Sequence, residues 1–318
     1  MSMNIIREAA IKLGNIDARP VTGQPFDVWR NRLMSTPLGQ HLPVAPTPTE
    51  LSGWPLDEIT IWVAIAPTPP IADWPDGCGE IGSFYMTSVQ RKARRAAWED
   101  AAVAAGYEIK RIRGAAALPE RAAAIRAGLG VHGLNGLMIA PDYGSFIDIT
   151  LLMLRAAPPP DARGADYDLS PGCGNCGECI KACPTGAISE NGVDAMLCLC
   201  AYIYRYADMP EEDYSKMGRR ITGCDACQFA CPKNAAVRRE QPSAEIAACM
   251  KLEQLLTKPD MDCISKYVHL NEVQVKSQAV LAAANTGRKD LLTLVEALIG
   301  NEDKTLDKMA KWAANQLR

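Results

Sequence analysis

The sequence predicts a protein of mixed helices and strands, of the α/β or α+β class, in three parts: residues 1–160, 161–240 and 241–318. Three observations predict this organisation. Strand-like and helix-like segments alternate in the first part, which is typical of layered α and β structure. Cysteines gather in the second part, and the third part carries only helical patterns. We therefore expect one mixed domain, one cysteine-rich module and one helical tail.

The composition is that of a globular protein. Of the 318 residues 48% are apolar and 22% are charged, which excludes a disordered chain. The formal net charge of −3 gives no global basic excess of the kind that accompanies nucleic-acid binding. The N-terminus lacks the basic start and apolar run of a signal peptide, and no apolar run approaches the ~18 residues of a membrane span. We expect a cytoplasmic protein, in which clustered cysteines bind metal more often than they form disulfides.

The first part opens with an expected helix over residues 3–14. Residues 36–76 hold many prolines, which predict ordered loop around a single strand over 58–66, EITIWVAIA. The other expected elements are a helix over 86–105 with an apolar stripe and a basic face, a strand over 107–112, a helix over 120–127 and a strand over 146–154.

The tail reads as three helical segments, separated at Asn285-Thr286-Gly287 and at Gly300-Asn301. This pattern resembles one unit of a HEAT-type repeat. Such units normally stack to bury a core, so a single unit has to pack against the rest of the protein. A proline-rich linker over 157–171 precedes the cysteine-rich module.

The cysteine spacing predicts iron–sulfur clusters. Cys173-x2-Cys176-x2-Cys179-x3-Cys183-Pro184 has the bacterial 4Fe-4S spacing. A second run follows, Cys224-x2-Cys227-x3-Cys231-Pro232. Thiolates are the soft, anionic donors that such clusters require. Zinc also uses Cys-x2-Cys pairs, but zinc does not explain the run of four that ends in Cys-Pro.

In two-cluster ferredoxins the cysteine before the proline ligates the other cluster. That rule assigns Cys173, Cys176, Cys179 and Cys231 to one cluster, and Cys183, Cys224 and Cys227 to the other. The eighth ligand is Cys198 or Cys200. The remaining cysteines, Cys78, Cys249 and Cys263, are expected to be small buried hydrophobic residues.

Several segments resemble the epoxyqueuosine reductase family, cobalamin-dependent iron–sulfur enzymes related to reductive dehalogenases. They are residues 126–130 (RAGLG), 133–145 (GLNGLMIAPDYGS), 173–188 (CGNCGECIKACPTGAI), Asp194-x3-Cys198 and 223–234 (GCDACQFACPKN). The resemblance implies a nitroreductase-like domain that holds base-off cobalamin, a ferredoxin-like double 4Fe-4S module that reduces the cobalt, and a short HEAT-like tail. It favours Cys198 as the eighth ligand, because Cys198 stands four residues after the aspartate.

Three departures from the family bear on the substrate. Gly114 stands where the family has the aspartate that protonates its substrate, and a glycine cannot transfer a proton. Gly133-Leu134-Asn135-Gly136 replaces the family's Gly-Lys-Asn-Thr, so the lysine is lost. The tail, which in the family helps to hold tRNA, is short. These changes argue against epoxyqueuosine as the substrate. A further alternative keeps tRNA as the substrate with water as the proton source, and the near-neutral charge disfavours it, because phosphate contacts usually need a basic surface.

Candidate cofactor-binding residues lie in the matched segment 133–145: Asn135, Tyr143, Gly144 and Ser145. A loop serine can donate a hydrogen bond to a phosphate or amide of a cofactor tail. Tyr85 is a candidate proton donor, and the competing interpretation is a core aromatic residue. His132 could ligate cobalt or donate a proton, or serve only in a turn.

The basic run Arg91, Lys92, Arg94 and Arg95 is either a solvated helix face or a site for phosphate or a partner. The sequence thus predicts a cobalamin-dependent reductase supplied by an external ferredoxin- or flavodoxin-type donor. The alternative is an electron-transfer protein that reduces the corrinoid of a partner protein.

Overall fold

The N-terminal part is built on a four-stranded sheet of order β1-β2-β7-β4. The computed structural model describes residues 4–36, 39, 46–112, 118–164, 168, 170–205 and 209–318. The strands are β1 (Asp17–Thr22), β2 (Ile59–Pro67), β7 (Ile147–Arg155) and β4 (Ile109–Lys110), and every pair is antiparallel. The α/β alternative is therefore wrong for this sheet, and the α+β alternative describes it.

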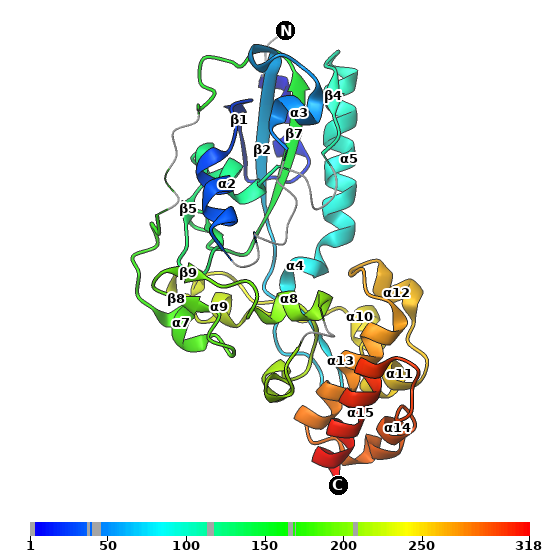
Figure 1. The fold of residues 1–318 in the computed structure, drawn as a ribbon. Coiled ribbons are helices and arrows are strands. Elements are labelled where there is room, and N and C mark those ends of the chain that lie inside the picture. The colour runs from blue at the N-terminus through cyan, green and yellow to red at the C-terminus, as the bar shows by residue number, and fades with distance from the viewer. Residues whose placement is uncertain are drawn as a thin grey trace.

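Helices cover both faces of the sheet. The central strands β2 and β7 are therefore buried along nearly their whole length. Trp62 and Ala64 face α1 (Asn4–Lys12) and α5 (Ser88–Ala104), where they pack with Trp98. The alternate residues of β2 face the opposite side and pack against α6 (Glu120–Arg126). Figure 1 shows α5 running along the edge of the domain beside β4 and β7. Shorter helices, α2 (Asp27–Met34), α3 (Pro48–Ser52) and α4 (Ser83–Met86), complete the domain.

Most expected elements of the first part are present with shifted ends. The helix expected over 86–105 is two helices, α4 and α5, with Thr87 between them. The strand expected over 107–112 shrinks to β4, two residues at the edge of the sheet. The edge strand β1 was not expected. Its Pro20 hides the pattern, although an edge strand tolerates proline because it needs no hydrogen bond on its outer side.

The cysteine-rich module is made of short elements below the sheet, and Figure 1 shows α7, α9, β8 and β9 close together there. They are α7 (Glu178–Ala182), β8 (Ile188–Ser189), β9 (Gly192–Val193), α8 (Leu199–Tyr204), β10 (Arg220–Thr222) and α9 (Ala226–Phe229). Two further short strands, β5 (Val131–His132) and β6 (Met138–Ile139), form a hairpin. Strand β10 pairs in parallel with β3 (Glu80–Ile81), which ties the module to the first part of the chain.

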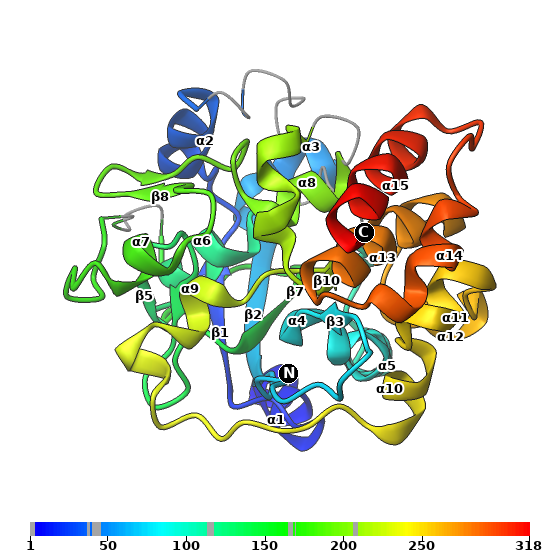
Figure 2. The same cartoon turned by 90° about the horizontal axis from the view of Figure 1, so that it is seen from below.

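The tail is helical, as expected, and packs against the rest of the protein. Its helices are α10 (Ala244–Cys249), α11 (Leu252–Thr257), α12 (Met261–Ser265), α13 (Glu272–Asn285), α14 (Leu292–Glu296) and α15 (Lys304–Leu317). Their core also contains Trp74 and Ile81 from the first part and Tyr214 from the module. Figure 2 shows α4 and β10 beside the tail helix α13.

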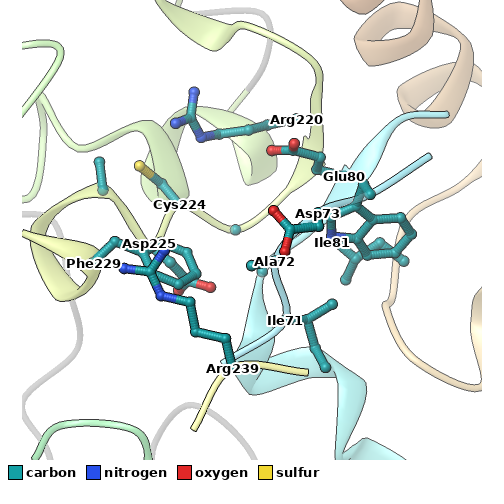
Figure 3. A pocket seen from close by; sticks show the side chains of 14 residues that line it. Ile71, Ala72, Asp73, Glu80, Ile81, Arg220, Cys224, Asp225, Phe229 and Arg239 are labelled. Atoms are coloured by element: carbon teal, nitrogen blue, oxygen red, sulfur yellow. The ribbon is translucent and has the colours of Figure 1, made fainter. Parts of the chain in front are cut away.

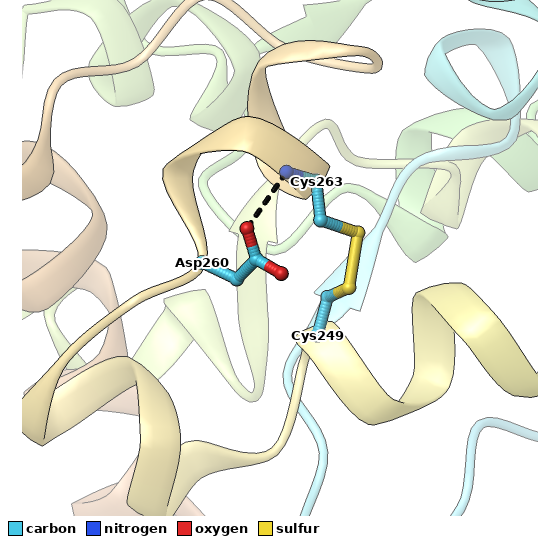
Figure 4. Close-up of side chains that lie close together, drawn as sticks. All are labelled: Cys249, Asp260 and Cys263. Atoms are coloured by element: carbon cyan, nitrogen blue, oxygen red, sulfur yellow. Dashed lines mark hydrogen bonds between the residues drawn. A yellow bond between two sulfur atoms is a disulfide. The ribbon is translucent and has the colours of Figure 1, made fainter.

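Two of the cysteines expected to be plain hydrophobic residues are joined. Cys249 at the end of α10 and Cys263 in α12 form a disulfide (Figure 4). Both are buried, so only their pairing departs from the expectation. Asp260 caps α12 by accepting a hydrogen bond from the backbone nitrogen of Cys263 at 3.0 Å. Cys78 stays a free, buried thiol. Among the described residues, no helix is long and apolar enough to cross a membrane.

Candidate functional site

Four of the predicted cluster ligands line one cavity. They are Cys173, Cys176, Cys179 and Cys231. The first three come from the loop around α7, and Cys231 comes from the end of α9, more than fifty positions later. Burial raises the pKa of the Cys179 and Cys231 thiols, so a cation is needed to hold them as thiolates. This set of donors fits one 4Fe-4S cluster.

The second group of cysteines also meets Asn135, through Cys227. Cys227 interacts electrostatically with Cys224 and Cys198. Cys183 packs in the same small apolar cluster as Cys227, which also includes Cys173 and Cys179 of the first group, so the two groups adjoin. Burial raises the pKa of Cys227 to about 12, although a hydrogen bond with the Asn135 side chain opposes this. The chemistry of this group fits a second cluster.

Cys198 and Cys200 adjoin each other, so the fold leaves both within reach of the second group. A hydrogen bond with Cys200 lowers the pKa of Cys198 to about 6, whereas the same bond raises that of Cys200. Cys200 also interacts with Cys224. Both thiols therefore adjoin the second group, and Cys198 is the one that the family resemblance favours.

A chain of buried hydrogen bonds fixes the loops that carry the cysteines. The backbone nitrogen and Oγ of Ser83 both donate to Asp225 Oδ2 at 2.7 Å. Gln228 Nε2 donates to Asp225 Oδ1 at 2.8 Å, and Ser145 Oγ donates to Gln228 Oε1 at 2.9 Å. Asn234 Nδ2 donates to Ser145 Oγ at 3.0 Å. This Ser83–Asn234 network connects α4, the 140–145 loop and both sides of α9.

Sequence reasoning missed Asp225, Gln228 and Asn234. All three lie between or beside cysteines of the segment 223–234. The sequence signal that could have identified them is a polar residue within a loop that carries metal ligands, because the backbone of such a loop must be held in place.

The candidate cofactor residues of the 133–145 segment meet protein groups. Ser145 is buried, and its Oγ and backbone nitrogen are both engaged in the Ser83–Asn234 network. Gly144 has φ +61°, and a Cβ there would lie 1.8 Å from Asn234 Oδ1. Asn135 lines the cavity of the first cysteine group. Tyr143 is 38% exposed in the turn before Gly144.

Tyr85 lies in α4, beside a hollow formed mainly by α5. Its ring packs edge-on against Phe84, with the ring centroids 5.6 Å apart. The hollow measures about 410 Å³ and is lined by Phe84, Arg91, Lys92, Arg95, Glu120 and Asp148. The sequence singled out the basic residues of this set but not the two carboxylates. Gly114, which stands at the family's aspartate position, lies outside the described residues.

His132 sits in β5, and its surroundings keep it neutral. Burial lowers its pKa to about 4, and the positive charges of Arg32 and Arg121 act in the same direction. An imidazole that is neutral at pH 7 cannot donate a proton as an imidazolium. The lowered pKa thus argues against His132 as a proton donor at pH 7.

A second pocket reaches the second cysteine group from the surface. Figure 3 shows Cys224 beside Arg220 on its wall, with Asp225 and Arg239 nearby. Glu80 and Asp73 lie on the opposite side. Because Cys224 lines this pocket, a partner or small molecule that entered it would come close to the second group.

Comparison with known proteins agrees with the two cysteine groups. Residues 172–234 match the family model described as a 4Fe-4S double cluster binding domain. Epoxyqueuosine reductase of Bacillus anthracis is 30% identical over 222 residues, which are 66% of this chain and 57% of that protein. The chain therefore spans little more than half the length of such curated relatives.

The fold has solved counterparts. The structure of epoxyqueuosine reductase from Streptococcus thermophilus has a TM-score of 0.78 at 22% identity, covering 100% of this chain and 90% of that one. A crystal structure of epoxyqueuosine reductase with an epoxyqueuosine-modified tRNA-Tyr stem loop has a TM-score of 0.77 at 22% identity, covering 99% of this chain and 89% of that one. The chain is thus similar in sequence to epoxyqueuosine reductases and shares their fold, and its residues 172–234 match a double 4Fe-4S cluster binding domain.

Proposed function

We propose that the chain is an iron–sulfur oxidoreductase that moves single electrons through two 4Fe-4S clusters. The observation that carries this proposal is the cavity lined by Cys173, Cys176, Cys179 and Cys231, because it joins three cysteines of one motif to the last cysteine of the other. That crossed arrangement is the one used by two-cluster ferredoxins. The second cluster would be held by Cys183, Cys224, Cys227 and Cys198.

The chain's own residues would hold the clusters in a fixed setting. Asn135 touches both groups, since it lines the first cavity and hydrogen-bonds with Cys227. The Ser83–Asn234 network keeps the loop between Cys224 and Cys231 in place. Fixed surroundings limit the reorganisation that accompanies each electron step and tune cluster potentials.

The finer proposal is a reductase that also uses cobalamin, with a nitroreductase-like corrinoid-binding domain over 1–160, a ferredoxin-like module over 161–240 and a HEAT-like tail over 241–318. When bound, the corrinoid would supply a reduced cobalt that acts as nucleophile or electron donor. The named relatives support this part through the family resemblance. The polar groups of Ser145 and Asn135 are hydrogen-bonded to other protein groups. Among the candidate cofactor-binding residues, Tyr143 is therefore the one whose exposed side chain could contact the cofactor.

The remaining candidate functions differ in their substrate. Loss of the family's aspartate and lysine, at Gly114 and Leu134, supports a substrate other than epoxyqueuosine. Modification of tRNA is the second candidate, because the curated relatives are named epoxyqueuosine reductase and one solved neighbour holds a tRNA stem loop. The third candidate is an electron carrier that reduces a partner's corrinoid.

Cobalamin binding separates the reductase from the carrier. The chain would be reconstituted anaerobically with iron and sulfide, incubated with cobalamin, freed of unbound ligand and examined by electron paramagnetic resonance. We expect the signal of base-off cob(II)alamin at about one per chain. Iron-loaded protein that retains no corrinoid would overturn the reductase proposal and favour the carrier. Reconstituted protein that, supplied with a chemical reductant, converts epoxyqueuosine to queuosine within tRNA would overturn the proposal of a different substrate.

A further inference from the structure

The basic face of α5 forms one wall of the hollow beside Tyr85. Arg91, Lys92 and Arg95 line it together with Phe84 from α4, Glu120 from the start of α6 and Asp148 from β7. Four separate elements therefore converge on one concave space of about 410 Å³. Arg91 and Arg95 are half-buried in this space, whereas a charge run on a fully solvated helix face would be exposed throughout.

The arginines of this face are held in place. Asp148 is only 2% exposed and lies 3.0 Å from Arg94 and 3.7 Å from Arg91. Arg95 lies 3.6 Å from Glu120. The guanidinium of Arg91 also stacks 4.0 Å from the centre of the Phe84 ring. Side chains fixed before binding lose little conformational entropy when a ligand arrives.

Positive charge exceeds negative charge around the hollow. Three cationic side chains of the lining, Arg91, Lys92 and Arg95, face two carboxylates, Glu120 and Asp148. Lys92 is exposed and forms no ion pair with a carboxylate of the described residues. The buried Nε atoms of Arg94 and Arg95 likewise have no hydrogen-bond partner among the described residues.

We propose that this hollow is a binding site for the phosphate group of a small molecule, held by Lys92 and the Arg91 and Arg95 guanidiniums. Guanidinium groups match phosphate oxygens with paired hydrogen bonds, and lysine adds a point charge. The inference deepens the proposed function and rests on it for the owner of the phosphate, which is either the substrate or the nucleotide tail of the corrinoid.

The direct test uses inorganic phosphate as the probe. Thermal unfolding of the cluster-loaded chain would be followed against phosphate concentration, with sodium chloride at matched ionic strength as reference. We expect saturable stabilisation of the wild type and an apparent affinity about tenfold weaker in Lys92→Gln, the loss typical of one charge-assisted hydrogen bond. Lys92 is exposed, so its replacement should not impair folding. The variant Arg91→Gln is a second test of the site, because it should also weaken phosphate binding.

Lys12→Gln is the matched control, because it removes one exposed helical lysine from the same domain, outside the lining of the hollow. It should bind phosphate as the wild type does. If Lys12→Gln and Lys92→Gln weaken phosphate binding equally, the effect comes from the overall charge of the protein, and the proposed site is overturned. So would a tRNA stem loop that binds through Lys92 while phosphate shows no saturation.

The two sources of phosphate separate with two corrinoids. Cobalamin carries a nucleotide tail with its phosphate, and cobinamide lacks that tail. If Lys92→Gln weakens cobalamin binding but not cobinamide binding, the phosphate belongs to the cofactor. If both corrinoids bind unchanged while phosphate binding falls, it belongs to the substrate. Phosphate binding that depends on Lys92 in a chain that retains no corrinoid would uphold the site and overturn the cobalamin-dependent part of the proposed function.

Discussion

Ser145 and Asn234 exchange two hydrogen bonds across 89 positions of sequence. The backbone nitrogen of Ser145 donates to Asn234 Oδ1 at 2.7 Å, and Asn234 Nδ2 donates to Ser145 Oγ at 3.0 Å. Asn234 follows the Cys231-Pro232 pair. A residue beside a predicted ligand of the first cluster is thereby attached to the loop that precedes β7.

Gly144 should tolerate no side chain, because this attachment brings Asn234 against it. An added Cβ would lie 1.8 Å from Asn234 Oδ1 and 2.9 Å from the carbonyl oxygen of Lys233. We expect Gly144→Ala to lower the free energy of unfolding by about 2 kcal/mol more than Gly287→Ala. Gly287 has a similar φ of +65° and nothing within 4 Å, so it isolates the cost of the backbone conformation. Equal losses in denaturant titrations would refute the contact.

The Cys249–Cys263 disulfide should stabilise the tail measurably. It links residues 14 positions apart, and closing a loop of that length is worth about 3 kcal/mol. A reductant should lower the melting temperature of the wild type. The double variant Cys249→Ala/Cys263→Ala should melt lower and ignore the reductant. A variant that still responds to reductant would show that the effect lies elsewhere.

His132 should make the folded chain sensitive to mild acid. Its pKa is lowered from 6.5 to about 4, so the unfolded chain binds more protons in this range and stability falls as the pH drops from 6.5 towards 4. Because the side chain is partly exposed, we expect a loss of about 1 kcal/mol between pH 7 and pH 5. His132→Gln should lose less over the same interval in denaturant titrations. An identical pH dependence in both proteins would contradict the assignment.

Cys198→Ser and Cys200→Ser should behave differently on reconstitution. If Cys198 is the eighth ligand, its replacement should lower the iron content from about eight towards about four per chain, whereas Cys200→Ser should keep about eight. Serine preserves the size of the side chain at both positions, so the pair serves as its own control. The reverse pattern would assign the ligand to Cys200.

The sequence predicted what depends on local patterns. The strands at β2 and β7 and the helices α1, α6 and α13 follow from apolar periodicity and β-branched residues. The cysteine motifs are likewise local, because the short spacing between their cysteines is enough to predict iron–sulfur ligands.

Long-range features were not readable from local patterns. Pro20 disguised β1, whose place is set by pairing with β2. Ser145 looked like a loop residue open to a ligand, yet a partner 89 positions away occupies it. Cys249 and Cys263 show no motif, and their pairing depends on how α10 and α12 pack. The carboxylates Glu120 and Asp148 join the basic helix only in three dimensions.

The most direct test of the account is the iron and acid-labile sulfide content of the chain after anaerobic reconstitution. Two clusters held by Cys173, Cys176, Cys179, Cys231, Cys183, Cys198, Cys224 and Cys227 predict about eight iron atoms and about eight sulfides per chain. About four of each, or zinc in place of iron without sulfide, would contradict it.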